Sequence, residues 1–95
     1  VTHVGNRHVF HQYTVRVERD REALAEALRA RGIETRVYYP LPVHQQASYL
    51  NLGEPSISLP ETERAAAQVL SLPVHPAVTD TQRERIARTV SELCA

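Results

Sequence analysis

The sequence lacks lysine and methionine, and each absence limits what the chain can do. All eleven basic side chains are arginine, so the chain has no amine for a Schiff base and no lysine for a phosphate-binding P-loop. Without methionine it also has no initiating residue, and we expect it to be a piece of a longer protein.

Cysteine and glycine are also scarce. Cys94 is the single cysteine, which excludes a disulfide within the chain, and the isolated glycines Gly5, Gly32 and Gly53 form no phosphate-cradling loop. No apolar run is long enough for a signal peptide or a membrane span, so we expect a soluble, cytoplasmic protein. Eleven acidic residues balance the basic ones, and the zero net charge favours neither nucleic acid nor an anionic membrane as a partner.

Hydrophobic periodicity predicts strands that alternate with helices. Period-two alternation predicts a half-buried strand over residues 9–17 and a second strand over 33–39, which Pro40 and Pro42 end by removing backbone donors. A short edge strand or extended connector follows in residues 70–78. The order predicts an α+β or α/β fold in one domain, with a small sheet covered on one face by helices.

Capping residues predict where the helices begin and end. In the second helix, Val69 and Leu70 lie at helical spacing, so we expect that helix to run up to Pro73. The residues that mark the three helices are Asp20 with Gly32, Ser58 with Glu61, and Thr79 with Gln82.

The histidines and arginines give only weak signals of a site. His11 lies on the first predicted strand and His8 directly precedes it; residues three apart in extended backbone point to opposite faces, so this pair cannot share a metal ion while the strand stays regular. We expect His11 to be a hydrogen-bonded core or edge residue. Arg36, on the second predicted strand, could face outward toward a phosphate or toward water, and we expect water. The arginines that alternate with glutamates on the helices are also expected to face water.

One stretch, "YYPLPVHQQASYL" at residues 38–50, concentrates tyrosine, proline, histidine and glutamine where the second strand ends. Two prolines fix its backbone, as a binding loop requires, and its hydroxyls and imidazole can donate to phosphate or sugar oxygens. The same tyrosines could instead anchor a packed proline turn. On chemistry alone, both interpretations stay open.

Four blocks of the sequence together resemble the C-terminal small domain of the DegT/DnrJ/EryC1/StrS family, the sugar-nucleotide aminotransferases. The resemblance covers nearly all residues from His8 onward and keeps the order and spacing of the blocks. They read "HQYTVRV", "RDREALAEALRARGIETRVYYPLPVHQQASYL", "LPETERAAAQVLSLPVHP" and "VTDTQRERIARTV".

The resemblance implies the fold and activity of a larger enzyme. It implies an α+β small domain with a mainly antiparallel sheet covered by helices, like that of aspartate-aminotransferase-type enzymes. The parent would be a homodimer that uses pyridoxal phosphate (PLP) to move an amino group, typically from glutamate, to a nucleotide-linked keto-sugar. The family keeps its cofactor lysine in the large N-terminal domain, so residues 1–95 are expected to bind no cofactor and to be inactive alone.

The resemblance also implies a substrate site in residues 38–50. The family pattern is similar to His-Tyr-Pro followed by Pro-x-His; Tyr38 replaces the first histidine, whereas Tyr39 and His44 match. It implies that Tyr38, Tyr39 and His44 bind substrate, with the first two near its diphosphate, and it assigns no catalytic residue to the chain. Because a phenol cannot carry the positive charge of an imidazolium, Tyr38 implies a weaker diphosphate contact or a different substrate.

Two other hypotheses remain at this point. The parent could be a sugar dehydratase of the same family, in which histidine replaces the cofactor lysine. The chain could also be a stand-alone binding or interaction module that kept the fold without catalysis. Nucleic-acid binding is disfavoured by the zero net charge and the scattered arginines.

Overall fold

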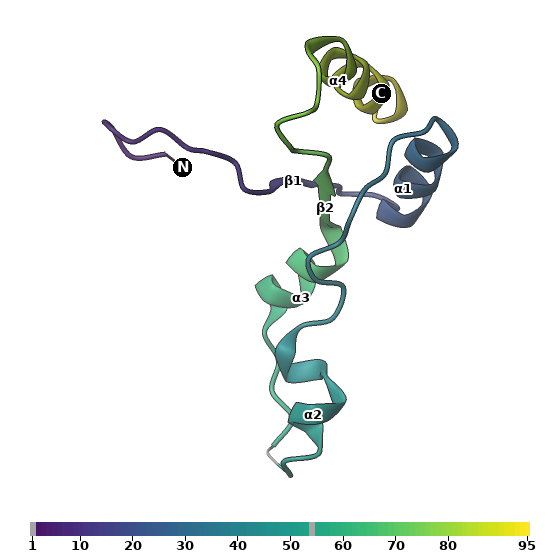
Figure 1. Ribbon diagram of the computed structural model, residues 1–95. Helices are drawn as coiled ribbons and strands as arrows, with labels where there is room; N and C mark the ends of the chain where they lie inside the picture. The colour runs from purple at the N-terminus through teal and green to yellow at the C-terminus, as the bar shows by residue number, and fades with distance from the viewer. Residues whose placement is uncertain (1, 54) are drawn as a thin grey trace.

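The computed structural model describes residues 2–53 and 55–95, and Figure 1 shows the path of the chain. It is built from two short strands, four α-helices and one turn of 3₁₀-helix, which confirms the predicted α+β class. In chain order the elements are β1 (Tyr13–Arg16), α1 (Arg21–Ala30), η1 (Val43–Gln45), α2 (Ala47–Leu50), α3 (Pro60–Gln68), β2 (Val69–Leu72) and α4 (Asp80–Leu93).

The sheet is antiparallel and smaller than predicted. β1 pairs with β2 along its whole length, so Tyr13 lies opposite Leu72 and Arg16 lies opposite Val69. The predicted strand over 9–17 therefore shrinks to four residues, because Phe10 has a left-handed φ of 49° and breaks the extended backbone ahead of β1. The predicted strand over 33–39 is reduced to one bridge, in which Arg36 exchanges two backbone hydrogen bonds with Ser71 at 3.0 and 2.7 Å.

The core lies between one face of these strands and the helices α1 and α4. Leu28 and Leu70 are fully buried there. Side chains alternate along a strand, so Val15 and Leu70 point to this covered face, and Thr14 and Ser71 point to the other one. The core cluster also contains Leu24 and Ile33, and the hydrophobic residues packed against it include Val15, Val37, Ile86, Val90 and Leu93.

Helix α1 begins and ends as its sequence predicts. The carboxylate of Asp20 accepts a hydrogen bond from the backbone N–H of Ala23 at 3.0 Å. At the other end, Gly32 adopts φ +77° and donates to Arg29, and Ile33 donates to Leu28. This is a Schellman turn, which needs a residue that tolerates positive φ and closes over a contact between buried side chains.

The predicted start of α4 is confirmed, whereas both predicted ends of α3 are wrong. The capping box of Thr79 and Gln82 is present at α4, as predicted. The box predicted for Ser58 and Glu61 is wrong, because α3 begins at Pro60, whose missing N–H and fixed φ suit the first helical position. The helix also ends at Gln68, so the prediction that it extends to Pro73 is wrong: Leu70 belongs to β2.

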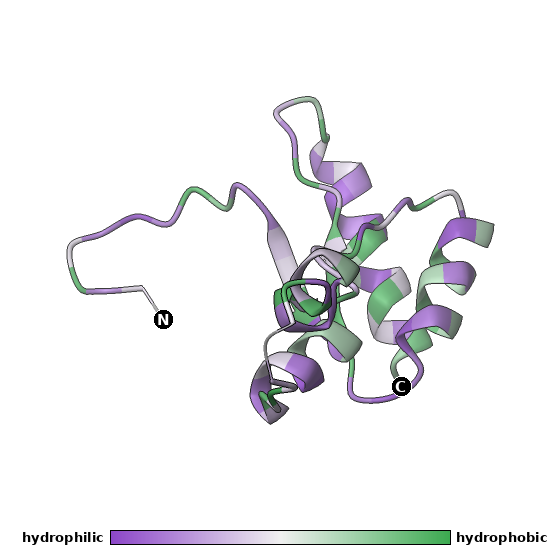
Figure 2. Ribbon diagram, turned by 90° about the horizontal axis from the view of Figure 1, so that it is seen from below, coloured by the Kyte–Doolittle hydropathy of each residue, from purple (hydrophilic) through white to green (hydrophobic). Residues whose placement is uncertain are grey.

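The chain is elongated, and two parts leave the core. Its radius of gyration is 16.3 Å, whereas a compact domain of this length has roughly 12 Å. In Figure 1 the N-terminal arm runs away on one side of the sheet, and the segment with α2 and α3 descends below it. Figure 2 shows apolar stretches gathered at the middle of the molecule, with polar stripes on the helices around it. Within residues 2–53 and 55–95, no helix has the length and apolar character to cross a membrane.

Candidate functional site

The segment 38–50 combines buried anchors with exposed side chains. Pro42 and His44 are buried, whereas Tyr39 is 71% exposed and Val43 is 70% exposed. Tyr38 and Tyr39 contact each other edge to face, with ring centroids 5.6 Å apart, and both rings are open to solvent. The interpretation as a packed turn therefore applies to Pro42 and His44, which are buried. The interpretation as a binding loop applies to Tyr38 and Tyr39, whose rings are open to solvent.

His44 is held by a residue that the sequence analysis did not single out. Its Nε2–H donates to Oε1 of Glu63 at 2.9 Å, and the side chain of His44 is 5% exposed. The same carboxylate oxygen accepts from the backbone N–H of Leu59 at 3.0 Å. Glu63 thus connects η1, which carries His44, to the first turn of α3.

These hydrogen bonds change the acidity of Glu63. The bond from His44 and then the one from the Leu59 N–H hold the pKa of the Glu63 carboxyl below its ordinary value. The carboxylate is therefore ionised at neutral pH and can keep the buried imidazole in one orientation. No local sequence pattern indicates the pairing of His44 with Glu63, since the two residues lie in different elements and 19 positions apart.

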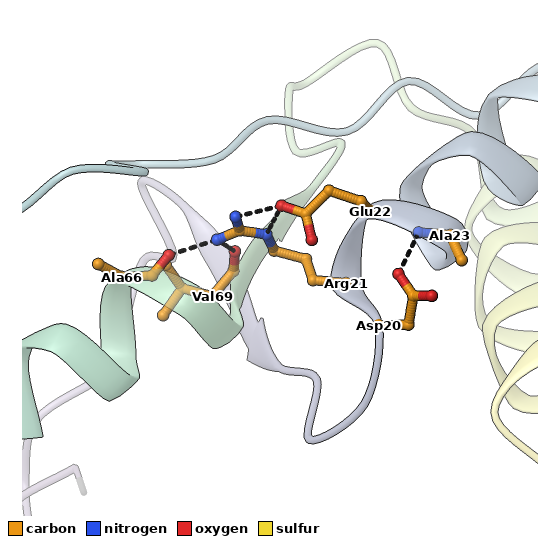
Figure 3. A network of polar contacts seen from close by, with 6 residues as sticks. All are labelled: Asp20, Arg21, Glu22, Ala23, Ala66 and Val69. Atoms are coloured by element: carbon orange, nitrogen blue, oxygen red, sulfur yellow. Dashed lines mark hydrogen bonds and ion pairs between the residues drawn. The ribbon is translucent and has the colours of Figure 1, made fainter.

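Arg21, at the start of α1, contacts the C-terminal end of α3 (Figure 3). Its guanidinium donates to the backbone carbonyl of Ala66 and, at 3.5 Å, to that of Val69, and it also pairs with Glu22. These carbonyls lie at the C-terminal end of α3, where helix carbonyls lack intrahelical partners. Arg21 is 8% exposed, so the expectation that the helix arginines face water is wrong for this residue.

Tyr38 also lines an open hollow of about 410 Å³. Arg36 and Tyr38 are two residues apart on the extended segment that pairs with β2, so their side chains point to the same face. This is the face that α1 and α4 leave uncovered. His11 is exposed and lines this hollow, which corrects its expected place as a core or edge residue. The polar residues at its wall are His11, Gln12, Glu34, Arg36, Tyr38, Ser71 and His75.

Sequence reasoning missed His75 and set Arg36 aside. The sequence did contain a signal for this polar face. Alternate positions along a strand share a face, and the polar side chains opposite the apolar face are Gln12, Glu34, Arg36 and Tyr38. The structure does not pair His44 with this hollow; it pairs His44 with Glu63. The assignment of Tyr38, Tyr39 and His44 to substrate binding stays a prediction.

The residues of this chain do not fit the anchoring of a pyridoxal cofactor. The sequence has no lysine. Its two aspartates are used at helix starts, where Asp20 caps α1 and Asp80 pairs with Arg83 at 3.2 Å. An amine for a Schiff base would have to come from outside residues 1–95.

Comparison with known proteins identifies relatives along almost the whole chain. The model of the DegT/DnrJ/EryC1/StrS aminotransferase family matches residues 1–91. A dTDP-3-amino-3,4,6-trideoxy-alpha-D-glucose transaminase from Streptomyces venezuelae is 45% identical over 84 residues, which are 88% of this chain and 22% of the relative. A pleiotropic regulatory protein from Geobacillus stearothermophilus is 43% identical over 93% of this chain and 23% of its own length.

Solved structures of family members have the same fold over this segment. The crystal structure of S. venezuelae DesV in complex with a ketimine intermediate superimposes with a TM-score of 0.86 at 42% identity, covering 99% of this chain and 25% of DesV. NtdA from Bacillus subtilis, solved with bound cofactor PMP, gives a TM-score of 0.81 at 31% identity, covering 92% of this chain and 21% of NtdA. The chain thus spans under a quarter of the length of the curated relatives described above.

Proposed function

The chain belongs to the DegT/DnrJ/EryC1/StrS aminotransferase family, and on this premise we propose that residues 1–95 are the C-terminal small domain of a nucleotide-sugar aminotransferase. The parent enzyme would transfer an amino group to a keto-sugar linked to a nucleoside diphosphate. The observation that carries the proposal is the match over residues 1–91 to enzymes of which it spans only about a quarter.

The division of labour follows from the residues present. The missing lysine is consistent with a pyridoxal cofactor held by another domain, where it would supply the amino-transfer chemistry. This segment would contribute substrate binding and would be inactive alone. We also propose that the parent enzyme is a homodimer.

Within the segment, we assign substrate contact to Tyr38 and Tyr39; for His44, predicted from the sequence as a further substrate contact, the burial favours a role in positioning the loop. The exposed rings of Tyr38 and Tyr39 can stack on a sugar or base and donate hydrogen bonds through their hydroxyls. His44 holds η1 against α3 through Glu63, which supports the assigned position of the loop. A loop with two buried anchors and two exposed aromatic rings suits a site wall.

The test uses the intact protein that contains this chain. We would incubate it with PLP, glutamate and a dTDP- or UDP-linked keto-sugar and analyse the sugar nucleotide by mass spectrometry. The proposal predicts an amino sugar that carries nitrogen from ¹⁵N-glutamate. Loss of water without nitrogen gain would indicate the dehydratase, and binding without any conversion would indicate a binding module.

A further inference from the structure

Helix α3 has little apolar surface with which to pack against its neighbours. Its residues read PETERAAAQ, so within Pro60–Gln68 the apolar side chains are three alanines and the proline ring, and Ala66 is the buried residue. So narrow an apolar stripe buries little area, and hydrophobic packing alone holds the helix weakly. The position of α3 therefore depends on the polar contacts at its two ends.

One of these contacts lies at the junction of α3 and β2, where Gln68 is followed directly by Val69. The chain changes from helix to extended backbone here without a loop, since Val69 has φ −75° and ψ 139°. The Arg21 guanidinium donates to a carbonyl on each side of the junction, that of Ala66 in α3 and, more weakly at 3.5 Å, that of Val69 in β2 (Figure 3). It thereby fixes the direction in which α3 leaves the sheet.

The place of Arg21 in α1 indicates that its charge stabilises this junction rather than its own helix. It is the first residue of α1, where the helix dipole disfavours a cation. It is nonetheless buried, with Glu22 as its paired carboxylate. At the C-terminal end of α3 the same charge is favourable, because the last carbonyls of a helix lack intrahelical donors and attract a cation.

The other contact lies at the start of α3 and reaches the loop over residues 38–50. Oε1 of Glu63 accepts from the N–H of Leu59 and from the buried ring of His44. A single hydrogen-bonded helix thus connects Arg21 at one end with His44 at the other. A shift of α3 at its junction with β2 would displace His44 and, with it, the exposed tyrosines of the loop.

We propose that Arg21 is a positioning residue for the loop over residues 38–50, which it holds through α3, Glu63 and His44. The hydrogen-bond partners of Arg21 are Glu22, Ala66 and Val69, all outside the loop, so it acts only through the helix. The effect on the loop is independent of the enzyme's activity. The effect on the substrate rests on the proposed function, in which this loop contacts the nucleotide sugar.

The first test is hydrogen exchange, measured by mass spectrometry on the intact protein that contains this chain. The amides of residues 45, 46 and 49–51 donate within η1 and α2 and report on the loop. We expect Arg21→Gln to speed their exchange about fivefold, the factor for one hydrogen bond, and to leave α4 unchanged. Arg29→Gln is the matched control, because Arg29 also lies on α1 in an ion pair, with Glu26 at 2.9 Å, but is exposed.

Two further variants test the path through α3. Glu63→Ala removes the contact at the other end of the helix and should speed exchange of the same amides. Combined with Arg21→Gln, it should add less than the product of the two separate factors, because both changes act through one helix. Arg21→Lys keeps the charge but cannot span both carbonyls, so it should give an intermediate rate. It decides the question if Arg21→Gln fails to fold.

The second test separates positioning from stability by steady-state kinetics of amino transfer. A displaced loop weakens contact with the sugar nucleotide, so Arg21→Gln should raise the KM of that substrate about fivefold, with kcat and the KM of glutamate unchanged. A protein that is only less stable would show a lower apparent kcat, because less of it is folded, and an unchanged KM.

The inference would be overturned by wild-type exchange of the loop amides in Arg21→Lys and Arg21→Gln, by equal acceleration in α4 or in Arg29→Gln, or by a lower kcat at unchanged KM. If the wild type transfers no amino group, the proposed function fails, and hydrogen exchange still decides the role of Arg21. Amino transfer with unaltered loop exchange in the variants would remove the inference alone.

Discussion

The buried imidazole of His44 donates to the carboxylate of Glu63 at 2.9 Å, and this contact joins the loop over residues 38–50 to helix α3. Glu63 also accepts from the N–H of Leu59, at the start of α3. One carboxylate therefore sets the position of the loop whose tyrosines are assigned to the substrate.

A double-mutant cycle tests this connection. We expect His44→Ala to lower the free energy of unfolding by about 2 kcal/mol, because it removes a buried ring and its hydrogen bond. We expect Glu63→Ala to destabilise the chain as well, and the double variant to lose less than the sum of the two. Urea unfolding of the wild type and the three variants provides the measurement. If the two losses of unfolding free energy simply added, the hydrogen bond between His44 and Glu63 would contribute nothing to stability.

The lowered pKa of Glu63 predicts a dependence on pH. A carboxyl group whose pKa is lower in the folded state than in the unfolded one stabilises the fold above its unfolded pKa, near 4.3, and this contribution disappears as pH falls through the folded value. Wild type should thus be more stable than Glu63→Gln at pH 7, and the difference should shrink below about pH 4.3. Thermal unfolding of both proteins from pH 7 to pH 2.5 measures it, and a constant difference would contradict the assignment.

Arg21 should be the arginine that matters most for folding. Replacement by alanine leaves the carbonyls of Ala66 and Val69 without their donor, and we expect a loss of about 2–3 kcal/mol. Arg88→Ala, at an exposed position on α4, should change stability by less than about 0.5 kcal/mol. Chemical denaturation compares the two, and equal effects would show that the buried guanidinium is dispensable.

Helix caps allow a direct comparison of sequence and structure. Thr79→Ala should cost about 1 kcal/mol, because its hydroxyl accepts from the N–H of Gln82 at 3.2 Å. Ser58→Ala should have almost no effect, since α3 begins at Pro60 with Leu59 as its N-cap. If Ser58→Ala proved as costly as Thr79→Ala, the start of α3 would be wrong.

Local patterns predicted the elements whose ends are fixed by their own residues. Asp20 and Gly32 bound α1, and Thr79 with Gln82 begins α4, because these caps depend on hydrogen bonds within one turn. The short strand predicted in residues 70–78 is confirmed in part by β2 (Val69–Leu72), whereas the helix predicted to run up to Pro73 is wrong beyond Gln68. Both predictions arose because a short apolar run fits a helix or a buried strand equally well. Pairing with β1 decides in favour of a strand, and pairing is not visible in a local pattern.

The candidate site was predictable only in part. The concentration of Tyr38, Tyr39 and His44 in one loop was visible in the sequence, and so was its resemblance to a family pattern. The partners Glu63 and Arg21 were not, since each acts on a segment distant in the sequence. The contact of Glu63 depends on the buried ring of His44, and that of Arg21 on its own burial; both follow from the tertiary arrangement.

The central claim is that the exposed tyrosines of this loop contact a nucleotide sugar in the intact protein. The most direct measurement is the dissociation constant of that ligand for wild type, Tyr39→Phe, Tyr38→His and the exposed-site control Arg88→Gln, by isothermal titration. We predict weaker binding for Tyr39→Phe by about fivefold, as one hydrogen bond is lost, tighter binding for Tyr38→His, and no change in the control. Unchanged affinity in both tyrosine variants would contradict the account and return these side chains to a packing role.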